Sequence, residues 1–184
     1  MDNVLYMADG EYFEGPDMRS TELMEIPSPY TTGILAKFFD QGLQPLIEIA
    51  RGCPYACTFC CDAPSQRNKV YRRTVEDTRE ELEYIASRVK FAGDLFVADL
   101  NFGQYKDDLE TARIIRSMID KYDWPKRISC SPGKSQPDRV LETVKIINGD
   151  QDGIVKFGSS LQSTDQLVLD SIKRKNLPME KALP

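Results

Sequence analysis

The sequence predicts an α/β fold in which strands and helices alternate along the chain. From residue 45 onward, short apolar segments of strand length are each followed by a segment whose apolar residues recur at helical spacing. Four such strand–helix units in succession favour parallel strands joined by crossover connections. The length of 184 residues, with 41% hydrophobic and 29% charged residues, suits one globular domain. Periodicity leaves a doubly wound sheet and a barrel open, and both bind ligands at the carboxyl ends of their strands.

Residues 1–45 differ from the rest of the chain. They combine several glycines and prolines with acidic residues scattered among the aromatic residues Tyr6, Tyr12 and Phe13. The segments around Pro29 and Gly33 are typical of turns. We therefore predict an irregular N-terminal arm or linker over 1–45, packed along a core domain that covers 46–184.

The core domain begins with a strand at 46–50, followed by a cysteine-rich loop. Thr74, with Asp77 three residues later, predicts the start of a helix over 74–89. A buried strand at 94–100 leads into a helix over 107–122, which Asp107 or Asp108 opens. A strand at 127–131 leads into a helix that Ser135 and Pro137 start and that Gly149 ends. A fourth strand at 153–159 and a helix capped by Ser163 complete the series.

The composition excludes several classes of function. Because the chain contains no histidine, Ser-His-Asp and Cys-His sites, HExxH zinc sites and imidazole acid–base catalysis are all excluded. The formal net charge of −5 argues against nucleic acid as a partner of this segment. The N-terminus lacks a signal-peptide pattern, and no window approaches the ~18 consecutive apolar residues of a membrane span. We expect a cytoplasmic protein, whose five cysteines are reduced.

Three of these cysteines, Cys53, Cys57 and Cys60, have the spacing CxxxCxxC directly after the first predicted strand. Three thiolates on one short loop suit a [4Fe–4S] cluster that leaves one iron without a protein ligand. A structural zinc site would need four ligands, and the adjacent Cys61 is poorly placed to be the fourth. The alternatives are an iron–sulfur electron carrier or sensor without catalysis, a zinc-stabilised interaction module, and buried structural thiols. We interpret Cys61 and Cys130 as structural thiols.

The sequence of this loop resembles that of the radical S-adenosylmethionine (SAM) superfamily. The cysteine spacing, with the aromatic Phe59 before the last cysteine, is similar to the superfamily as a whole, and the segment 48–57, EIARGCPYAC, is similar to its branch of cobalamin-binding enzymes and methylthiotransferases. Segment 160–163, SLQS, is similar to that branch as well. The resemblance runs from about residue 46 to the end of the chain. It implies a partial (β/α) barrel with four of the six units that the family barrel usually has.

The resemblance also assigns residues to the cofactors. It makes Cys53, Cys57 and Cys60 the cluster ligands. Phe59 would lie against the adenine of SAM, residues after the second strand would hold its amino group, and residues after the third and fourth strands would reach its ribose or carboxylate. The SAM-binding candidates are Phe59, Asp99, Asn101, Ser129, Ser160 and Gln162. Each of the polar candidates is also a plausible helix cap or turn residue.

The function implied by the resemblance is reductive cleavage of SAM to methionine and a 5′-deoxyadenosyl radical, which removes hydrogen from a substrate. We expect a small-molecule or lipid-like substrate and a reductant such as flavodoxin or ferredoxin. Cobalamin would require a domain that is absent here, and the open edge of an incomplete sheet favours association with another chain. The basic run of Arg67, Lys69, Arg72 and Arg73 either meets an anionic group of cofactor or substrate or forms a solvated surface.

Overall fold

A computed structural model of the chain describes residues 4–16, 25–63, 68–156, 158 and 161–174. Its centre is a parallel three-stranded sheet in the order β3 (Leu46–Ile47), β6 (Asp94–Phe102) and β7 (Arg127–Pro132). Leu46 lies opposite Phe96, and Phe96 lies opposite Ser129. The predicted parallel strands are therefore present, and the longest of them, β6, is central.

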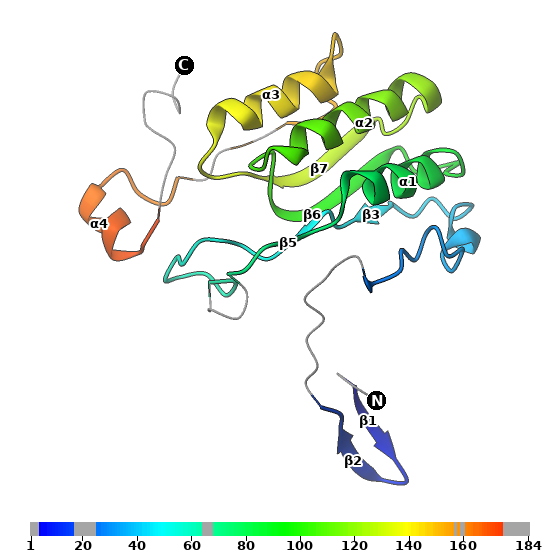
Figure 1. Ribbon diagram of the computed structural model, residues 1–184, viewed down its shortest axis with the longest axis horizontal. Helices are drawn as coiled ribbons and strands as arrows, with labels where there is room; N and C mark the ends of the chain where they lie inside the picture. Colours follow the sequence, from blue (N-terminus) through cyan, green and yellow to red (C-terminus); the bar gives the residue numbers. More distant parts are fainter. Residues whose placement is uncertain (1–3, 17–24, 64–67, 157, 159–160, 175–184) are drawn as a thin grey trace.

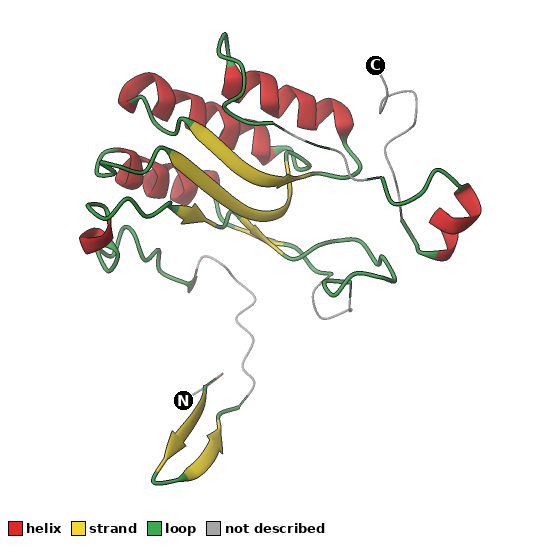
Figure 2. Ribbon diagram, turned by 180° about the vertical axis from the view of Figure 1, so that it is seen from behind, coloured by secondary structure: helices red, strands yellow, loops and turns green. Residues whose placement is uncertain are grey.

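Three helices, α1 (Val75–Ala86), α2 (Asp107–Tyr122) and α3 (Pro137–Asn148), cover one face of this sheet (Figure 1, Figure 2). Leu82, Leu95 and Ile115 are fully buried in the core between helices and sheet. On the other face, Leu46 and its neighbour Phe96 are exposed. All three helices lie on one side, as in one part of a barrel wall, whereas a doubly wound sheet has helices on both sides.

Some helix boundaries follow the signals in the sequence, but α1 ends at Ala86 and not at residue 89. The residue before α3 is Gln136 and not Ser135, because the Ser135 hydroxyl pairs with Tyr55. The Thr74 hydroxyl accepts a hydrogen bond from the Asp77 backbone N–H at 3.1 Å, which satisfies one free donor of the first turn of α1. Pro137 occupies the first turn of α3, where its missing N–H costs nothing. Gly149 follows the last residue of α3 with a φ of 55°, a conformation that glycine adopts without strain.

The first predicted strand, 46–50, is not continuous. The structure divides it into β3, which pairs with β6, and β4 (Ala50–Arg51), which pairs antiparallel with β5 (Tyr71–Arg72). The break has a local cause, because the Asp99 carboxylate accepts hydrogen bonds from the backbone N–H groups of Ile49 and Ala50. These two N–H groups therefore form no backbone hydrogen bonds with β6, and the strand is interrupted there.

The fourth strand–helix unit differs from the prediction, and residues 157 and 159 of its predicted strand lie outside the described residues. Among the described residues of 153–159, a single parallel bridge joins Val155 to Ile128 of β7. The following helix, α4 (Gln166–Ser171), begins after Asp165 and not after Ser163. The Asp165 carboxylate accepts from the N–H of Leu167 at 2.8 Å, and an aspartate suits this capping position.

The N-terminal arm is more ordered than predicted, since β1 (Leu5–Ala8) and β2 (Glu11–Glu14) form an antiparallel hairpin. A short 3-10 helix, η2 (Ala36–Phe38), follows further along the arm. Tyr30 and Phe39 are buried in the core, and the Tyr30 hydroxyl bonds to both the N–H and the carbonyl of Leu46, each at 2.9 Å. The boundary at residue 45 stays a prediction. In the described part of the chain, no helix is long and apolar enough to cross a membrane.

Candidate functional site

The cysteine loop leaves the sheet directly after β4. Cys53 and Cys57 are buried, Cys60 is half-buried and Cys61 is exposed, and all four are free thiols. The N–H of Cys60 donates to the carbonyl of Cys57 at 3.1 Å, which closes a turn between the second and third cysteines of the motif. The N–H of Thr58 donates to the carbonyl of Ile172 at 3.1 Å, which connects the cysteine loop to the residue that follows α4.

The loops that follow β6 and β7 meet the cysteine loop at the carboxyl edge of the sheet. The Tyr55 hydroxyl donates to Gln104 Oε1 at 2.8 Å and also pairs with the Ser135 hydroxyl. Gln104 Oε1 also accepts from the backbone N–H of Lys134 at 3.3 Å. Gly133 permits this close approach, because a Cβ atom at this position would lie 2.7 Å from Gln104 Cβ. Three loops far apart in sequence are thus joined at one place.

Asn101 and Lys134 are two polar side chains close to the first cysteine. Asn101 is only 3% exposed, and its Nδ2 donates to Cys53 Sγ at 3.4 Å. Lys134 Nζ donates to the Leu100 carbonyl at 2.9 Å and to Asn101 Oδ1 at 3.1 Å. Burial lowers the pKa of Lys134, and Arg174 lowers it further, whereas Cys53, Cys60 and Cys57 all raise it. Lys134 is therefore a cation close to the motif cysteines and is linked to Cys53 through Asn101, and sequence reasoning did not single it out.

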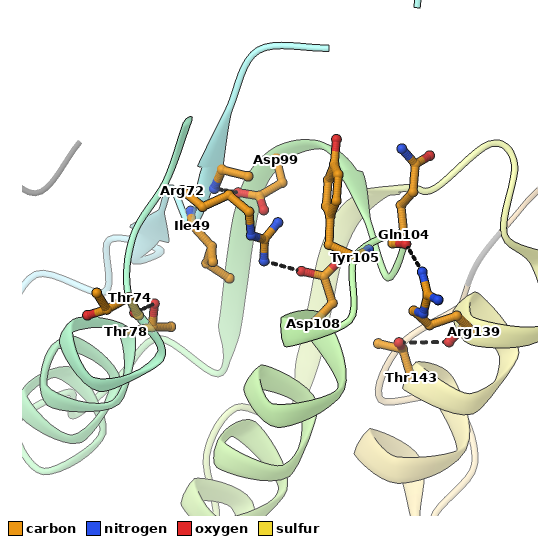
Figure 3. A network of polar contacts seen from close by, with 11 residues as sticks. Ile49, Arg72, Thr74, Thr78, Asp99, Gln104, Tyr105, Asp108, Arg139 and Thr143 are labelled. Carbon is orange, nitrogen blue, oxygen red and sulfur yellow. Dashed lines mark hydrogen bonds and ion pairs between the residues drawn. The ribbon is translucent and has the colours of Figure 1, made fainter. Parts of the chain in front are cut away.

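Asp99 lies on β6 beside the start of the cysteine loop and is 3% exposed. Its Oδ1 accepts from the N–H of Ile49 at 2.8 Å and of Ala50 at 3.0 Å (Figure 3). Its Oδ2 has no hydrogen-bond partner among the residues that the structure describes. Burial raises the pKa of Asp99 to about 7, although the two backbone hydrogen bonds oppose the rise. In this structure the Asp99 side chain fastens the entry of the cysteine loop to the central strand.

A buried ion pair stands next to Asp99. Arg72 Nη2 lies 2.5 Å from Asp108 Oδ1, and the guanidinium carbon lies 4.6 Å from the centre of the Tyr105 ring (Figure 3). Burial raises the pKa of Asp108, while Arg72 opposes the rise. In the sequence, Arg72 stands out only as one member of a run of basic residues. That run was expected either to bind an anionic group or to form a solvated surface. Its inward ion pair was missed, because nothing local in the sequence marks Asp108 as its partner.

The other candidate residues are more dispersed. Phe59 is 53% exposed on the cysteine loop, and Ser129 is exposed on the uncovered face of the sheet, opposite Phe96. Gln162 is exposed before α4, and Ser160 lies outside the described residues. Among the described residues, no group of three or more Cys, Asp or Glu side chains is arranged to hold one metal ion. The thiolates of a cluster bind different irons, and the assignments of the cluster ligands and of the SAM-binding residues stay predictions.

Comparison with known families settles the relationship. The family described as the radical SAM superfamily matches residues 47–182. The chain belongs to the radical SAM superfamily. This radical SAM chain is 35% identical over 171 residues to a 2-(S-pantetheinyl)-carbapenam-3-carboxylate methyltransferase of Streptantibioticus cattleyicolor. It is 32% identical over 168 residues to the cobalamin-dependent radical SAM methyltransferase TokK of Streptomyces tokunonensis. These matches cover 90% and 88% of the chain but only 25% and 24% of the two relatives.

The fold comparison agrees with the family. A structure of the cobalamin-dependent SAM radical enzyme OxsB, with aqua-cobalamin and SAM bound, superposes on 97% of this chain with a TM-score of 0.57. The sequence identity is 18%, and the match covers 26% of the OxsB chain. The similarity shows that the radical SAM chain shares its fold with one part of a larger enzyme.

Proposed function

We propose that this chain is the part of a radical SAM enzyme that binds a [4Fe–4S] cluster through Cys53, Cys57 and Cys60 and binds SAM at the open iron. The observation that carries the proposal is the position of the cysteine loop. It follows β4 at the carboxyl edge of the parallel sheet, where α/β proteins bind ligands, and Asn101 links the Lys134 ammonium to Cys53. The one-sided helix layer supports the proposal that the sheet is part of a (β/α) barrel of about four units.

The three cysteines and the polar residues around them suit a [4Fe–4S] cluster. A thiolate ligand is favoured by nearby positive charge and by hydrogen bonds to its sulfur, and Lys134 and Asn101 provide both. When bound, the cluster supplies the electron that cleaves SAM, a reaction that no side chain performs. The protein's own part is to bind and orient the cofactors. Asp99 holds the loop entry, Tyr55 ties the loop to its neighbours, and the exposed Phe59 ring is available to stack against an adenine.

We propose methyl transfer as the overall reaction, since the two relatives are methyltransferases and one of them is cobalamin-dependent. Cobalamin would be held by residues outside this chain. We propose a small-molecule or lipid-like substrate and a flavodoxin or ferredoxin as the reductant. We also propose that the open edge of the incomplete sheet associates with another chain.

The test is anaerobic reconstitution of the full chain with iron and sulfide, followed by metal analysis and electron paramagnetic resonance (EPR). About four irons per chain, and formation of 5′-deoxyadenosine from SAM after reduction, support the proposal. One zinc and no iron would instead identify a zinc-stabilised module. A cluster that neither binds nor cleaves SAM would identify an electron carrier or sensor.

The ligand assignment has a matched control within the loop. Replacing Cys53, Cys57 or Cys60 by Ala should each remove the cluster, because three thiolates are needed. Cys61→Ala should retain it, since Cys61 is exposed beside the motif. Loss of iron from Cys61→Ala as complete as from the other three variants would show that the ligand set is wrong.

A further inference from the structure

Lys134 is held in place by contacts that do not involve a cofactor. Its backbone N–H is bonded to Gln104 Oε1, and the preceding residue, Gly133, donates its N–H to the carbonyl of Phe102 at 2.8 Å. The two oxygen atoms that accept from Nζ belong to the Leu100 carbonyl and the Asn101 amide, so neither carries a formal charge. The positive charge of Lys134 is therefore fixed at this position without being neutralised by those partners.

Asn101 connects that charge to a motif cysteine. Its Oδ1 accepts from Lys134 Nζ, and its Nδ2 donates to Cys53 Sγ at 3.4 Å. The Lys134 contact fixes the orientation of the amide, because an ammonium group can only donate and must face the oxygen. The Asn101 N–H is consequently directed at the sulfur, and Asn101 is 3% exposed, so water does not compete for it.

We infer that Lys134, acting through Asn101 and by its own charge, is a positioning residue that raises the reduction potential of a cluster bound at Cys53; this inference rests on the proposed function. Reduction adds one negative charge to a cluster. A nearby cation and an N–H donor to a ligand sulfur stabilise the reduced state more than the oxidised state, and partial burial strengthens both effects. Loss of either group therefore makes the cluster harder to reduce.

The experiment compares midpoint potentials of the reconstituted full chain by EPR-monitored redox titration, with and without SAM. Lys134→Met should change the ratio of reduced to oxidised cluster at a given potential by about tenfold, a negative shift of about 59 mV for one electron. Lys134→Arg should stay near the wild-type potential, because it retains the charge. Lys126→Met removes an exposed lysine at the opposite end of the sheet, beside the start of β7, and should leave the potential unchanged.

Two further variants separate folding from the proposed effect. Lys134→Gln retains an N–H donor for Asn101 Oδ1 and loses the charge, so it should show the negative shift even if Lys134→Met does not fold. Asn101→Leu removes the donor to Cys53 and should shift the potential in the same direction. Circular dichroism and iron content establish that each variant is folded and loaded before its potential is measured.

The outcomes distinguish the inference from the proposed function. A cluster that forms normally, with the same potential in wild type, Lys134→Gln and Lys134→Met, overturns the inference and leaves the proposed function intact. Loss of SAM affinity at an unchanged potential would also overturn it, since Lys134 would then act on the cofactor and not on the cluster. Failure of the wild-type chain to bind iron at all would overturn the proposed function and, with it, the inference.

Discussion

Replacing Asp99 by Asn tests how the buried carboxyl beside the cysteine loop affects stability. Asp99 is 3% exposed, and its Oδ1 accepts two backbone N–H groups of the segment that enters the loop. Asn keeps an oxygen acceptor for these N–H groups but cannot ionise. The substitution therefore removes the titration of residue 99 while it changes the size of the side chain very little.

Burial sets both the direction and the size of the expected effect. It raises the pKa of Asp99 from 3.8 to about 7 in the folded chain. Between these two values the native state holds a proton that the unfolded state has released, so the free energy of unfolding falls as pH rises from about 4 to about 7. At 1.36 kcal/mol for each pKa unit, the upper limit of this loss is about 4 kcal/mol. Above pH 7, both states are ionised and the loss is complete.

Urea unfolding of the reduced, metal-free chain at several pH values between 5 and 8 measures this effect. Wild type should lose stability relative to Asp99→Asn as the pH rises, so that the variant is the more stable of the two at pH 8. Asp150→Asn, an exposed position, should follow wild type at every pH. A stability difference between Asp99→Asn and wild type that is constant from pH 5 to 8 would refute the argument, because Asp99 would then be ionised throughout.

Two further predictions concern single positions in the fold. Gly133→Ala should lower the free energy of unfolding by about 1–3 kcal/mol in urea titrations, because the added Cβ would lie 2.7 Å from Gln104 Cβ. Gly158→Ala is the control, since a Cβ at that exposed position meets no atom of the described residues within 4 Å, chain neighbours aside, and equal effects at both glycines would contradict the contact. Thr74→Ala should cost about 1 kcal/mol through loss of the cap of α1, and Thr74→Ser should restore most of it. Equal stability of the Ala and Ser variants would show that the hydroxyl does not matter.

The parts of the fold that could be predicted are those with local signals. The periodicity around Leu82 and Ile115 predicts α1 and α2, and the apolar run at 94–100 predicts β6. The spacing of the three cysteines, together with the residues that flank them, was sufficient to identify the superfamily. Each of these signals lies within about 20 residues of chain, which is the range over which helical or strand periodicity is informative.

The features that could not be predicted depend on pairs of residues far apart in sequence. The contact of Asn101 with Cys53 spans 48 positions, and the pair of Arg72 with Asp108 spans 36. The break in the first strand arises because Asp99, on another strand, takes the N–H groups of Ile49 and Ala50. No pattern near either partner indicates such a pairing, because it is produced by the packing of the sheet.

The hydrophobic cluster that joins the strands and helices includes Ile49 and Val75 but none of the described residues between them, although Ala50, Cys53 and Cys57 are also buried. Hydrogen bonds connect the cysteine loop to its surroundings: Tyr55 to the loops after β6 and β7, Thr58 to Ile172, and Cys53 to Asn101 of β6. In zinc fingers, by contrast, metal binding supplies the free energy of folding itself. Here we expect the order of assembly to be reversed. The sheet and helices would form first, and the proposed iron–sulfur group would be delivered afterwards into a scaffold that is already folded, without any need for the chain to unfold.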